Sequence, residues 1–190
     1  FCSPGNAGIA TSVKTTLIPD LSPEDLLDLA LARKIDLTVV GPEAPLVDGI
    51  SDLFREAGLL LMGPSASAAR LEGSKVFAKN FMGRHDIPTA AYRVFDNADD
   101  AERALKAGAF HLPLVIKADG LAAGKGVLIC TSIQEALASV DRIMRQGQFG
   151  KAGRQLVVEE FLEGDEASFM ILADGAGNIV PMAISKDHKQ

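Results

Sequence analysis

The residues best suited to chemistry lie in one stretch, residues 114–129, where two apolar runs flank a glycine-rich segment. The first run carries Lys117, and the segment between the runs holds Lys125 and three glycines, Gly120, Gly124 and Gly126. Glycine lets a backbone turn and approach a ligand closely, because it has no Cβ atom. Backbone N–H groups and a lysine together form a concave positive surface that suits phosphate. The stretch therefore predicts a flexible loop between two strands that covers a polyphosphate.

Two familiar phosphate-binding motifs do not describe this loop. A P-loop has four residues between its glycines and continues into a helix, whereas three residues separate Gly120 from Gly124 and a strand-like run follows Gly126. The dinucleotide pattern G-x-G-x-x-G also fails, because Val-Leu-Ile follows Gly126. An ordinary glycine-rich hairpin is the alternative interpretation.

Two lysines stand at positions that favour an anionic partner. Lys75 follows Ser74, a predicted helix N-cap, and so lies in the first turn of a helix. A cation there faces the positive end of the helix dipole at a cost of about 0.3–1 kcal/mol, which a bound anion would offset. Lys117 stands in an apolar strand, where a charge needs a partner or a route to water. The alternatives are a solvated surface lysine at 75 and an edge lysine reaching into solvent at 117.

Acidic residues gather between Glu159 and Glu166, a segment with five carboxylates among apolar residues. If a strand ends near Phe161, one or two of these carboxylates point into a cleft. Carboxylates accept hydrogen bonds from ribose hydroxyls and from the amino group of a base, although a solvated acidic hairpin is the alternative. Near the end of the sequence, His188 is either a functional base or an exposed side chain.

Composition narrows the class of protein. A length of 190 residues suffices for one large domain or two small ones. The net charge of −6 argues against a nucleic-acid partner, which needs a basic surface. No apolar run reaches the roughly 18–20 residues that span a bilayer, so we expect no membrane partner.

The cysteines and the first residues bear on the compartment. Cys2 and Cys130 form no metal-binding pattern and indicate a reducing compartment, the cytoplasm, with Cys130 acting as a small strand hydrophobe. No signal peptide is visible. Because the chain opens on Phe1 instead of methionine, we expect it to be incomplete.

The first third of the chain alternates helices and strands. Ser22 and Pro23 begin a helix, residues 35–40 and 59–62 read as buried strands, and residues 50–57 form a helix between them. This alternation predicts a parallel sheet. Ligands of such sheets bind beyond the carboxyl ends of the strands, where the segment Gly41-Pro-Glu-Ala-Pro45 lies.

After Gly63 the pattern becomes α+β. The expected helices cover residues 65–71, 74–85, 98–107 and 132–145, and the expected strands cover residues 91–95, 114–118, 127–131, 155–161, 166–173 and 178–183. Residues 174–177 read as a hairpin turn. The fold class is therefore α/β, with a parallel-sheet N-terminal domain followed by α+β lobes.

These elements together resemble the ATP-grasp superfamily, and within it the glycinamide ribonucleotide synthetases, the phosphoribosylamine–glycine ligases of purine biosynthesis. The matching stretches follow the family's order and cover nearly the whole chain: residues 4–8, 36–46, 71–75, 115–127, 159–162, 166–169 and 187–189. The resemblance implies a truncated N-terminal domain of residues 1–63, which lacks the family's first strand. It further implies an incomplete central ATP-grasp lobe of residues 64–95 and 163–190, and a small lid lobe of residues 96–162.

The resemblance also implies roles for individual residues. It assigns ATP to Lys75, Lys117, Gly120, Gly124, Lys125, Gly126, Glu159, Phe161, Leu162 and Glu166, with the lysines and glycines on the phosphates, residues 159–162 on the adenine and Glu166 on the ribose. It assigns phosphoribosylamine to Gly41, Pro42, Glu43, Pro45, Asp187, His188 and Lys189. The small-molecule substrates would be glycine and 5-phosphoribosylamine.

The family's Mg²⁺ ligands are expected beyond Gln190, so we assign no metal ligand and no catalytic residue within this chain. The piece alone is expected to be inactive. The alternatives are another ATP-grasp carboxylate–amine ligase and a non-catalytic nucleotide-binding fragment. The sequence does not indicate an oligomeric state.

Overall fold

A computed structural model describes residues 1–12, 14–122 and 125–186 of the chain. The chain divides into two compact units, Phe1–Glu160 and Phe161–Gln190. Among the described residues, none of the helices combines the length and the apolar character that crossing a bilayer requires.

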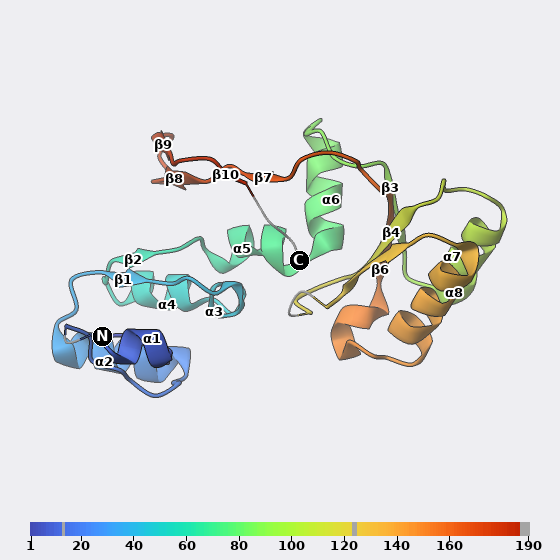
Figure 1. The fold of residues 1–190 in the computed structure, drawn as a ribbon. Coiled ribbons are helices and arrows are strands. Elements are labelled where there is room, and N and C mark those ends of the chain that lie inside the picture. The colour runs from blue at the N-terminus through green and yellow to red at the C-terminus, as the bar shows by residue number, and fades with distance from the viewer. Residues whose placement is uncertain (13, 123–124, 187–190) are drawn as a thin grey trace. The chain divides into compact units, whose positions relative to one another are not determined.

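The first unit begins with a small α/β region (Figure 1). Its elements are α1 (Ala7–Ala10), α2 (Pro23–Arg33), β1 (Thr38–Val39), α3 (Glu43–Val47), α4 (Ile50–Glu56), β2 (Leu61–Met62) and α5 (Ala66–Gly73). As predicted, Ser22 caps α2 by accepting a hydrogen bond from the backbone N–H of Asp25 at 3.1 Å. The strands β1 and β2 are parallel, with Thr38 opposite Leu61, which confirms the predicted parallel pairing.

The strand expected over residues 35–40 is shorter in the structure. The N–H of Ile35 donates to the carbonyl of Ala30 at 2.9 Å, so its N–H closes the C-terminal end of α2 and does not join the sheet. The ladder with β2 begins only at Thr38, whose N–H donates to Leu60 at 3.1 Å. A core of residues from α2 to α5 holds this region together: Ala30, Leu46, Ile50, Phe54 and Ala69.

The rest of the first unit is built around an antiparallel sheet with the strand order β3-β6-β4-β5. Its strands are β3 (Tyr92–Phe95), β4 (Leu114–Ala118), β5 (Val127–Cys130) and β6 (Leu156–Glu160). Its helices are α6 (Lys75–Arg84), α7 (Ala98–Lys106), α8 (Ile133–Val140), the π-helix Asp141–Arg145 and the 3-10 helix Gly150–Arg154. The predicted strand 114–118 has the observed bounds, and the helix predicted to end near residue 145 ends in the π-helical turn.

The two faces of this sheet have different neighbours (Figure 1). Leu114, Ile116 and Val158 point to the face that α7 and α8 cover, and they form the main core with residues such as Leu105. Side chains alternate along a strand, so Lys117 and Glu159 share the opposite face. Helix α6 contacts β6 on that side. The register places Val115 opposite Glu159, which makes Lys117 and Glu159 diagonal neighbours across β4 and β6.

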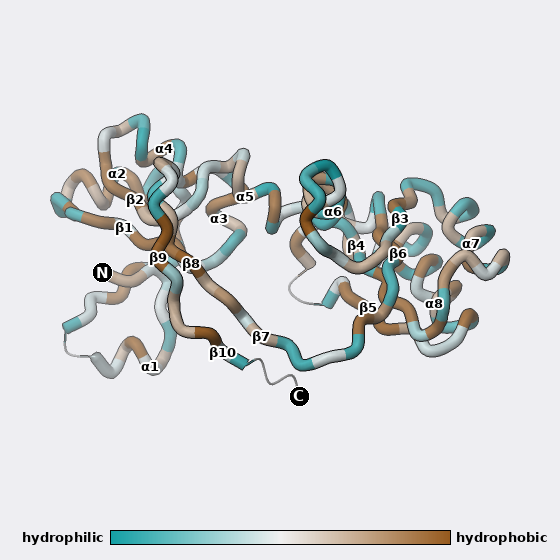
Figure 2. The backbone as a smooth tube through the Cα atoms, turned by 90° about the horizontal axis from the view of Figure 1, so that it is seen from above, coloured by the Kyte–Doolittle hydropathy of each residue, from teal (hydrophilic) through white to brown (hydrophobic). Residues whose placement is uncertain are grey.

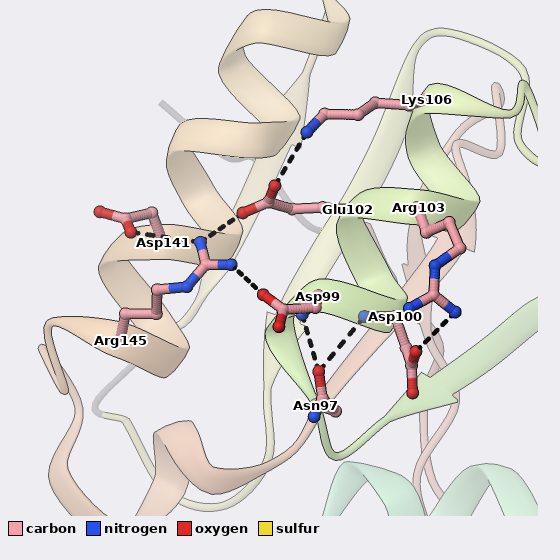
Figure 3. A network of polar contacts seen from close by, with 8 residues as sticks. All are labelled: Asn97, Asp99, Asp100, Glu102, Arg103, Lys106, Asp141 and Arg145. Atoms are coloured by element: carbon pink, nitrogen blue, oxygen red, sulfur yellow. Dashed lines mark hydrogen bonds and ion pairs between the residues drawn. The ribbon is translucent and has the colours of Figure 1, made fainter.

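A surface ion network ties α7 to the π-helix (Figure 3). Arg145 pairs with Asp99, Glu102 and Asp141, and Lys106 pairs with Glu102 at 3.0 Å. The hydrogen bond from Arg145, followed by that from Lys106, lowers the pKa of Glu102 below its usual value. The network therefore holds α7 and the π-helix together outside the core.

The second unit consists of two short ladders. Strand β7 (Ala167–Ser168) pairs with β10 (Ser185–Lys186), and β8 (Ile171–Ala173) pairs with β9 (Ile179–Pro181), both antiparallel. The predicted hairpin turn is confirmed: Asp174 accepts hydrogen bonds from the N–H groups of Ala176 and Asn178 at 2.8 and 3.1 Å. The strand predicted over residues 166–173 is interrupted in the structure: Ser168 pairs with Ser185 and Ile171 pairs with Pro181, so the register against residues 179–186 shifts by one residue between the two ladders. Figure 2 shows hydrophobic residues along β8 and β9, whose side chains are exposed.

Candidate functional site

The site is organised around Glu159, a buried carboxylate on β6. Glu159 is 2% exposed, on the sheet face that α6 contacts. A buried charge is costly unless it is paired. One carboxylate oxygen pairs with the ammonium of Lys117 on β4, and the other pairs with the ammonium of Lys79 on α6. Two cations on one carboxylate leave this cluster with a net charge of about +1.

Lys117 therefore has the partner that its apolar strand requires, and that partner is Glu159. Its side chain is 29% exposed, so it is neither a solvated edge lysine nor a buried one. The next residue, Ala118, donates its N–H to the carbonyl of Gly126 at 2.8 Å, which closes the two ends of the glycine loop. Lys117 thus stands at the base of the loop, as its position in the sequence predicts.

Lys79 belongs to this cluster, although its sequence context did not single it out. It is 7% exposed, and its ammonium also donates to Oγ1 of Thr89 at 2.7 Å and contacts the carbonyl of Ala90 at 3.5 Å. The available signal was its spacing, because Lys79 lies four residues after Lys75 and so shares a helix face with it. Nothing local distinguishes it from a surface lysine, since its partners come from β6 and from the segment before β3.

Asp119 joins the glycine loop to the beginning of α6. Its carboxylate accepts hydrogen bonds from Oγ of Ser74 at 2.9 Å and from the N–H of Val76 at 3.0 Å. Ser74 caps the helix as predicted, by accepting from the N–H of Phe77 at 3.0 Å. The positive end of the α6 dipole thus already faces a carboxylate of the protein itself, which offsets the unfavourable position of Lys75.

Lys75 is held at the same junction and is not a freely solvated lysine. Its ammonium donates to the carbonyl of Gly120 at 2.9 Å. Gly120 adopts φ +100°, a conformation that side chains rarely take, and a Cβ there would lie 3.2 Å from the Cβ of Ala152. The start of the loop is therefore anchored on α6 and packed against the 3-10 helix.

Lys125, further along the loop, is exposed, and Gly126 is buried. Gly124 lies outside the described residues.

A pocket of about 340 Å³ opens at the segment proposed for the second substrate. Gly41 and Glu43 line it, together with Leu46, Pro64, Ala69 and Glu72. Of the other residues expected there, Pro42 is the N-cap of α3 and Pro45 lies within α3. Asp187, His188 and Lys189 lie outside the described residues. The lining carries two carboxylates, Glu43 and Glu72, which are acceptors for hydroxyl or amino groups.

The remaining residues expected at the nucleotide lie in the second unit. Phe161 is half-buried, while Leu162 and Glu166 are exposed. Among the residues that the structure describes, no group of three histidine, cysteine, aspartate or glutamate side chains is arranged to hold a metal ion.

The chain matches known proteins along its whole length. Residues 1–72 match the model of the phosphoribosylglycinamide synthetase N domain, and residues 73–190 match that of the phosphoribosylglycinamide synthetase ATP-grasp (A) domain. A phosphoribosylamine–glycine ligase from Pseudomonas aeruginosa is 53% identical over 193 residues, which cover 100% of this chain and 44% of that protein. The chain thus spans less than half the length of the curated relatives that it matches.

Solved structures share the fold. The phosphoribosylamine–glycine ligase of Thermotoga maritima superposes with a TM-score of 0.70 at 31% identity, over 96% of this chain and 42% of that one. The biotin carboxylase domain of the Hydrogenobacter thermophilus 2-oxoglutarate carboxylase, solved with ADP, magnesium and bicarbonate, superposes with a TM-score of 0.70 at 23% identity, over 87% of this chain and 37% of that one.

The fold and the lysine–carboxylate site beside a glycine loop are those of an ATP-grasp protein. The α/β fold class expected from the sequence is confirmed. More closely, the chain belongs to the phosphoribosylglycinamide synthetase family.

Proposed function

We propose that the whole protein is a cytoplasmic ATP-dependent ligase of purine biosynthesis, which joins glycine to 5-phosphoribosylamine and releases ADP and phosphate. Family membership supports the substrates. The observation that carries the proposal for this chain is the cluster of Lys79, Glu159 and Lys117, whose net positive charge lies at the base of the glycine loop.

The residues present fit the phosphates of ATP. An ammonium has three N–H donors, and Lys117 has Glu159 as its ionic partner among the described residues. The donors that remain suit phosphate oxygens. Lys75 would exchange its bond to the carbonyl of Gly120 for a phosphate. Residues 120–126, including Gly124, Lys125 and Gly126, would cover the phosphates.

At the other end of the nucleotide, we propose that Glu159 and the backbone of Phe161 and Leu162 hold the adenine edge. Lys117 would lie near the adenine as well. Glu166 would accept hydrogen bonds from the ribose hydroxyls. The family resemblance supports these roles, together with the position of Glu159 near the end of β6, two residues before Phe161.

We propose that phosphoribosylamine binds at the pocket of Gly41 and Glu43. Glu43 and Glu72 suit its ribose hydroxyls and its amine, because carboxylates are acceptors only. Pro42 and Pro45 would shape this pocket. Asp187, His188 and Lys189 are proposed to complete the site, and a cation among them would suit the 5-phosphate.

The reaction needs charge neutralisation and positioning more than covalent help from side chains. The carboxylate of glycine attacks the γ-phosphorus and gives glycyl phosphate and ADP. The amine of phosphoribosylamine then attacks the acyl carbon, forms the amide bond, releases phosphate and loses a proton. Lys75 and Lys117 would hold the phosphate oxygens, and the glycine loop would exclude water. Magnesium, when bound, neutralises phosphate charge, and we propose that its ligands lie outside the residues described.

We further propose the division into an N-terminal domain of residues 1–63, a central lobe of residues 64–95 and 163–190, and a lid lobe of residues 96–162. Limited proteolysis of the whole protein, with and without ATP, tests this division. Cleavage near residues 63 and 96 that ATP slows supports it, and cleavage within the β4–β6 sheet contradicts it.

The activity is tested by ADP release from the whole protein with ATP, magnesium, glycine and phosphoribosylamine, which is generated in the assay. The expected result is ADP release that requires both glycine and the amine, with glycinamide ribonucleotide identified by mass. Replacing glycine by alanine or by bicarbonate is the control. ADP release that proceeds with another acid and not with glycine contradicts the proposal and points to a different ATP-grasp ligase.

A further inference from the structure

The cluster of Lys79, Glu159 and Lys117 holds a second lysine, Lys79, besides the one proposed to contact phosphate. Lys79 pairs with Glu159, donates to Thr89 at 2.7 Å and contacts the carbonyl of Ala90 at 3.5 Å. Its ammonium thus has an ion pair, a short hydrogen bond and a longer contact, all with groups of the protein. The hydroxyl of Tyr92 also donates to the backbone carbonyl of Lys79 at 2.8 Å, which fixes the helix at this residue. The side chain of Lys79 is therefore directed into the protein and not toward a ligand.

Lys117 differs from Lys79 in exposure and in the number of its partners. The side chain of Lys117 is 29% exposed and that of Lys79 is 9% exposed. Of the described residues, Glu159 is the ionic partner of Lys117. Lys117 is thus the lysine of this pair that can turn toward a ligand while keeping its contact with the carboxylate.

The charge that a ligand meets at Lys117 depends on Lys79. Glu159 and Lys117 alone would form a neutral pair, with little attraction for a polyphosphate. Lys79, on the far oxygen of the same carboxylate, adds a unit charge in a buried place, where the effective dielectric is lower than in water. We propose that Lys79 is a positioning residue: it neutralises Glu159, so that Lys117 presents a net positive charge to the nucleotide's phosphates. This inference rests on the nucleotide binding proposed above and adds a residue to it.

A purely structural role for Lys79 makes a different prediction. A lysine that only supported the fold would weaken adenosine and ATP binding by the same factor when removed. A lysine that sets the charge at Lys117 would weaken ATP binding more, because adenosine has no phosphates. The ratio of the adenosine and ATP dissociation constants separates these roles, since the contribution of the base appears in both constants and cancels.

The experiment measures both dissociation constants by calorimetry at fixed low salt, in the whole protein and its variants. Lys79→Met is expected to lower the ratio about tenfold, as one unit charge acting on several phosphate charges at a moderate dielectric should. Lys79→Met combined with Glu159→Gln removes both buried charges and restores the net charge, so the ratio should return to within about threefold of the unaltered protein. Lys106→Met, an exposed lysine on α7, is the matched control and should leave the ratio unchanged.

The experiment still tests the role of Lys79 if the Lys79→Met variant does not fold. Glu159→Gln alone raises the net charge of the cluster, and the ratio should rise. The double variant differs from Glu159→Gln only at Lys79 and should have a lower ratio, so equal ratios in these two variants also overturn the role of Lys79. A ratio unaffected by both Lys79→Met and Glu159→Gln, or one that does not recover in the double variant, overturns the role of Lys79. An unaltered protein that binds neither ATP nor adenosine instead contradicts the proposed function itself.

Discussion

Replacing Asp119 should loosen the junction between the glycine loop and α6. Asp119→Ala removes the acceptor for Ser74 and for the N–H of Val76 in the first turn of the helix. A hydrogen bond to a charged group contributes about 1.5–3 kcal/mol, and an anion at a helix N-terminus about 0.3–1 kcal/mol. These contributions overlap and the site is only partly buried, so we expect a loss of about 2–4 kcal/mol in the free energy of unfolding.

Asp119→Asn separates the charge from the hydrogen bonds. The amide oxygen can still accept from the N–H of Val76, so the expected loss is about 1 kcal/mol. Asp165→Ala is the control, because its pair with Lys186 at 2.9 Å is exposed and should contribute less than about 1 kcal/mol.

The assay is urea unfolding followed by circular dichroism, with thermal midpoints as a second measurement. For a chain of this size, 1 kcal/mol corresponds to about 2–4 °C, so Asp119→Ala should lower the midpoint by about 4–16 °C. An Asp119→Ala variant as stable as the control, or an asparagine variant less stable than the alanine variant, refutes the reasoning. The loop would then be held by contacts other than the carboxylate.

Three further predictions concern the cations and the titratable groups. Lys117→Ala in the whole protein should weaken ATP binding more than Lys125→Ala, because Lys117 is held by a strand and a carboxylate while Lys125 is exposed and must be ordered at about 1–2 kcal/mol per residue. Burial raises the pKa of the Cys130 thiol, so iodoacetamide at pH 8 should modify it slowly until urea unfolds the protein. Arg145 lowers the pKa of Glu102, so their pairing stabilises the fold above the unfolded pKa of about 4.3 and is lost as pH falls through the lower folded value.

The measurements for these predictions are direct. ATP dissociation constants at matched salt compare the two lysine variants, and an equal or larger effect of Lys125→Ala contradicts Lys117 as the main anchor. Mass spectrometry follows alkylation, with Cys2 as the internal comparison, and rapid labelling of Cys130 in the folded chain contradicts its burial. Glu102→Gln should flatten the fall of unfolding free energy between about pH 5 and 3, and an unchanged slope contradicts the pairing.

The sequence by itself determined the features that depend only on residues close together in the chain, such as helix starts and strand positions. Ser22 and Ser74 begin helices at the predicted positions, because a side-chain cap acts within three residues. The strand 114–118 was readable from its apolar run, and alternation placed Lys117 on a defined face. The lysines and glycines of residues 114–129 were enough to predict a phosphate site, and the seven matching stretches in their order were enough to indicate the family.

Tertiary structure decided which partners those residues have. Lys79 became part of the site only because α6 packs on the face of the sheet that carries Glu159, and these two residues are 80 positions apart in the sequence. Asp119 reaches Ser74 across 45 positions for the same reason. Burial makes these partners necessary. A lysine in water needs no partner, whereas an unpaired charge on Lys79, which is 7% exposed, would be costly. A helix pattern specifies the face on which a lysine lies, and only packing specifies what that face meets.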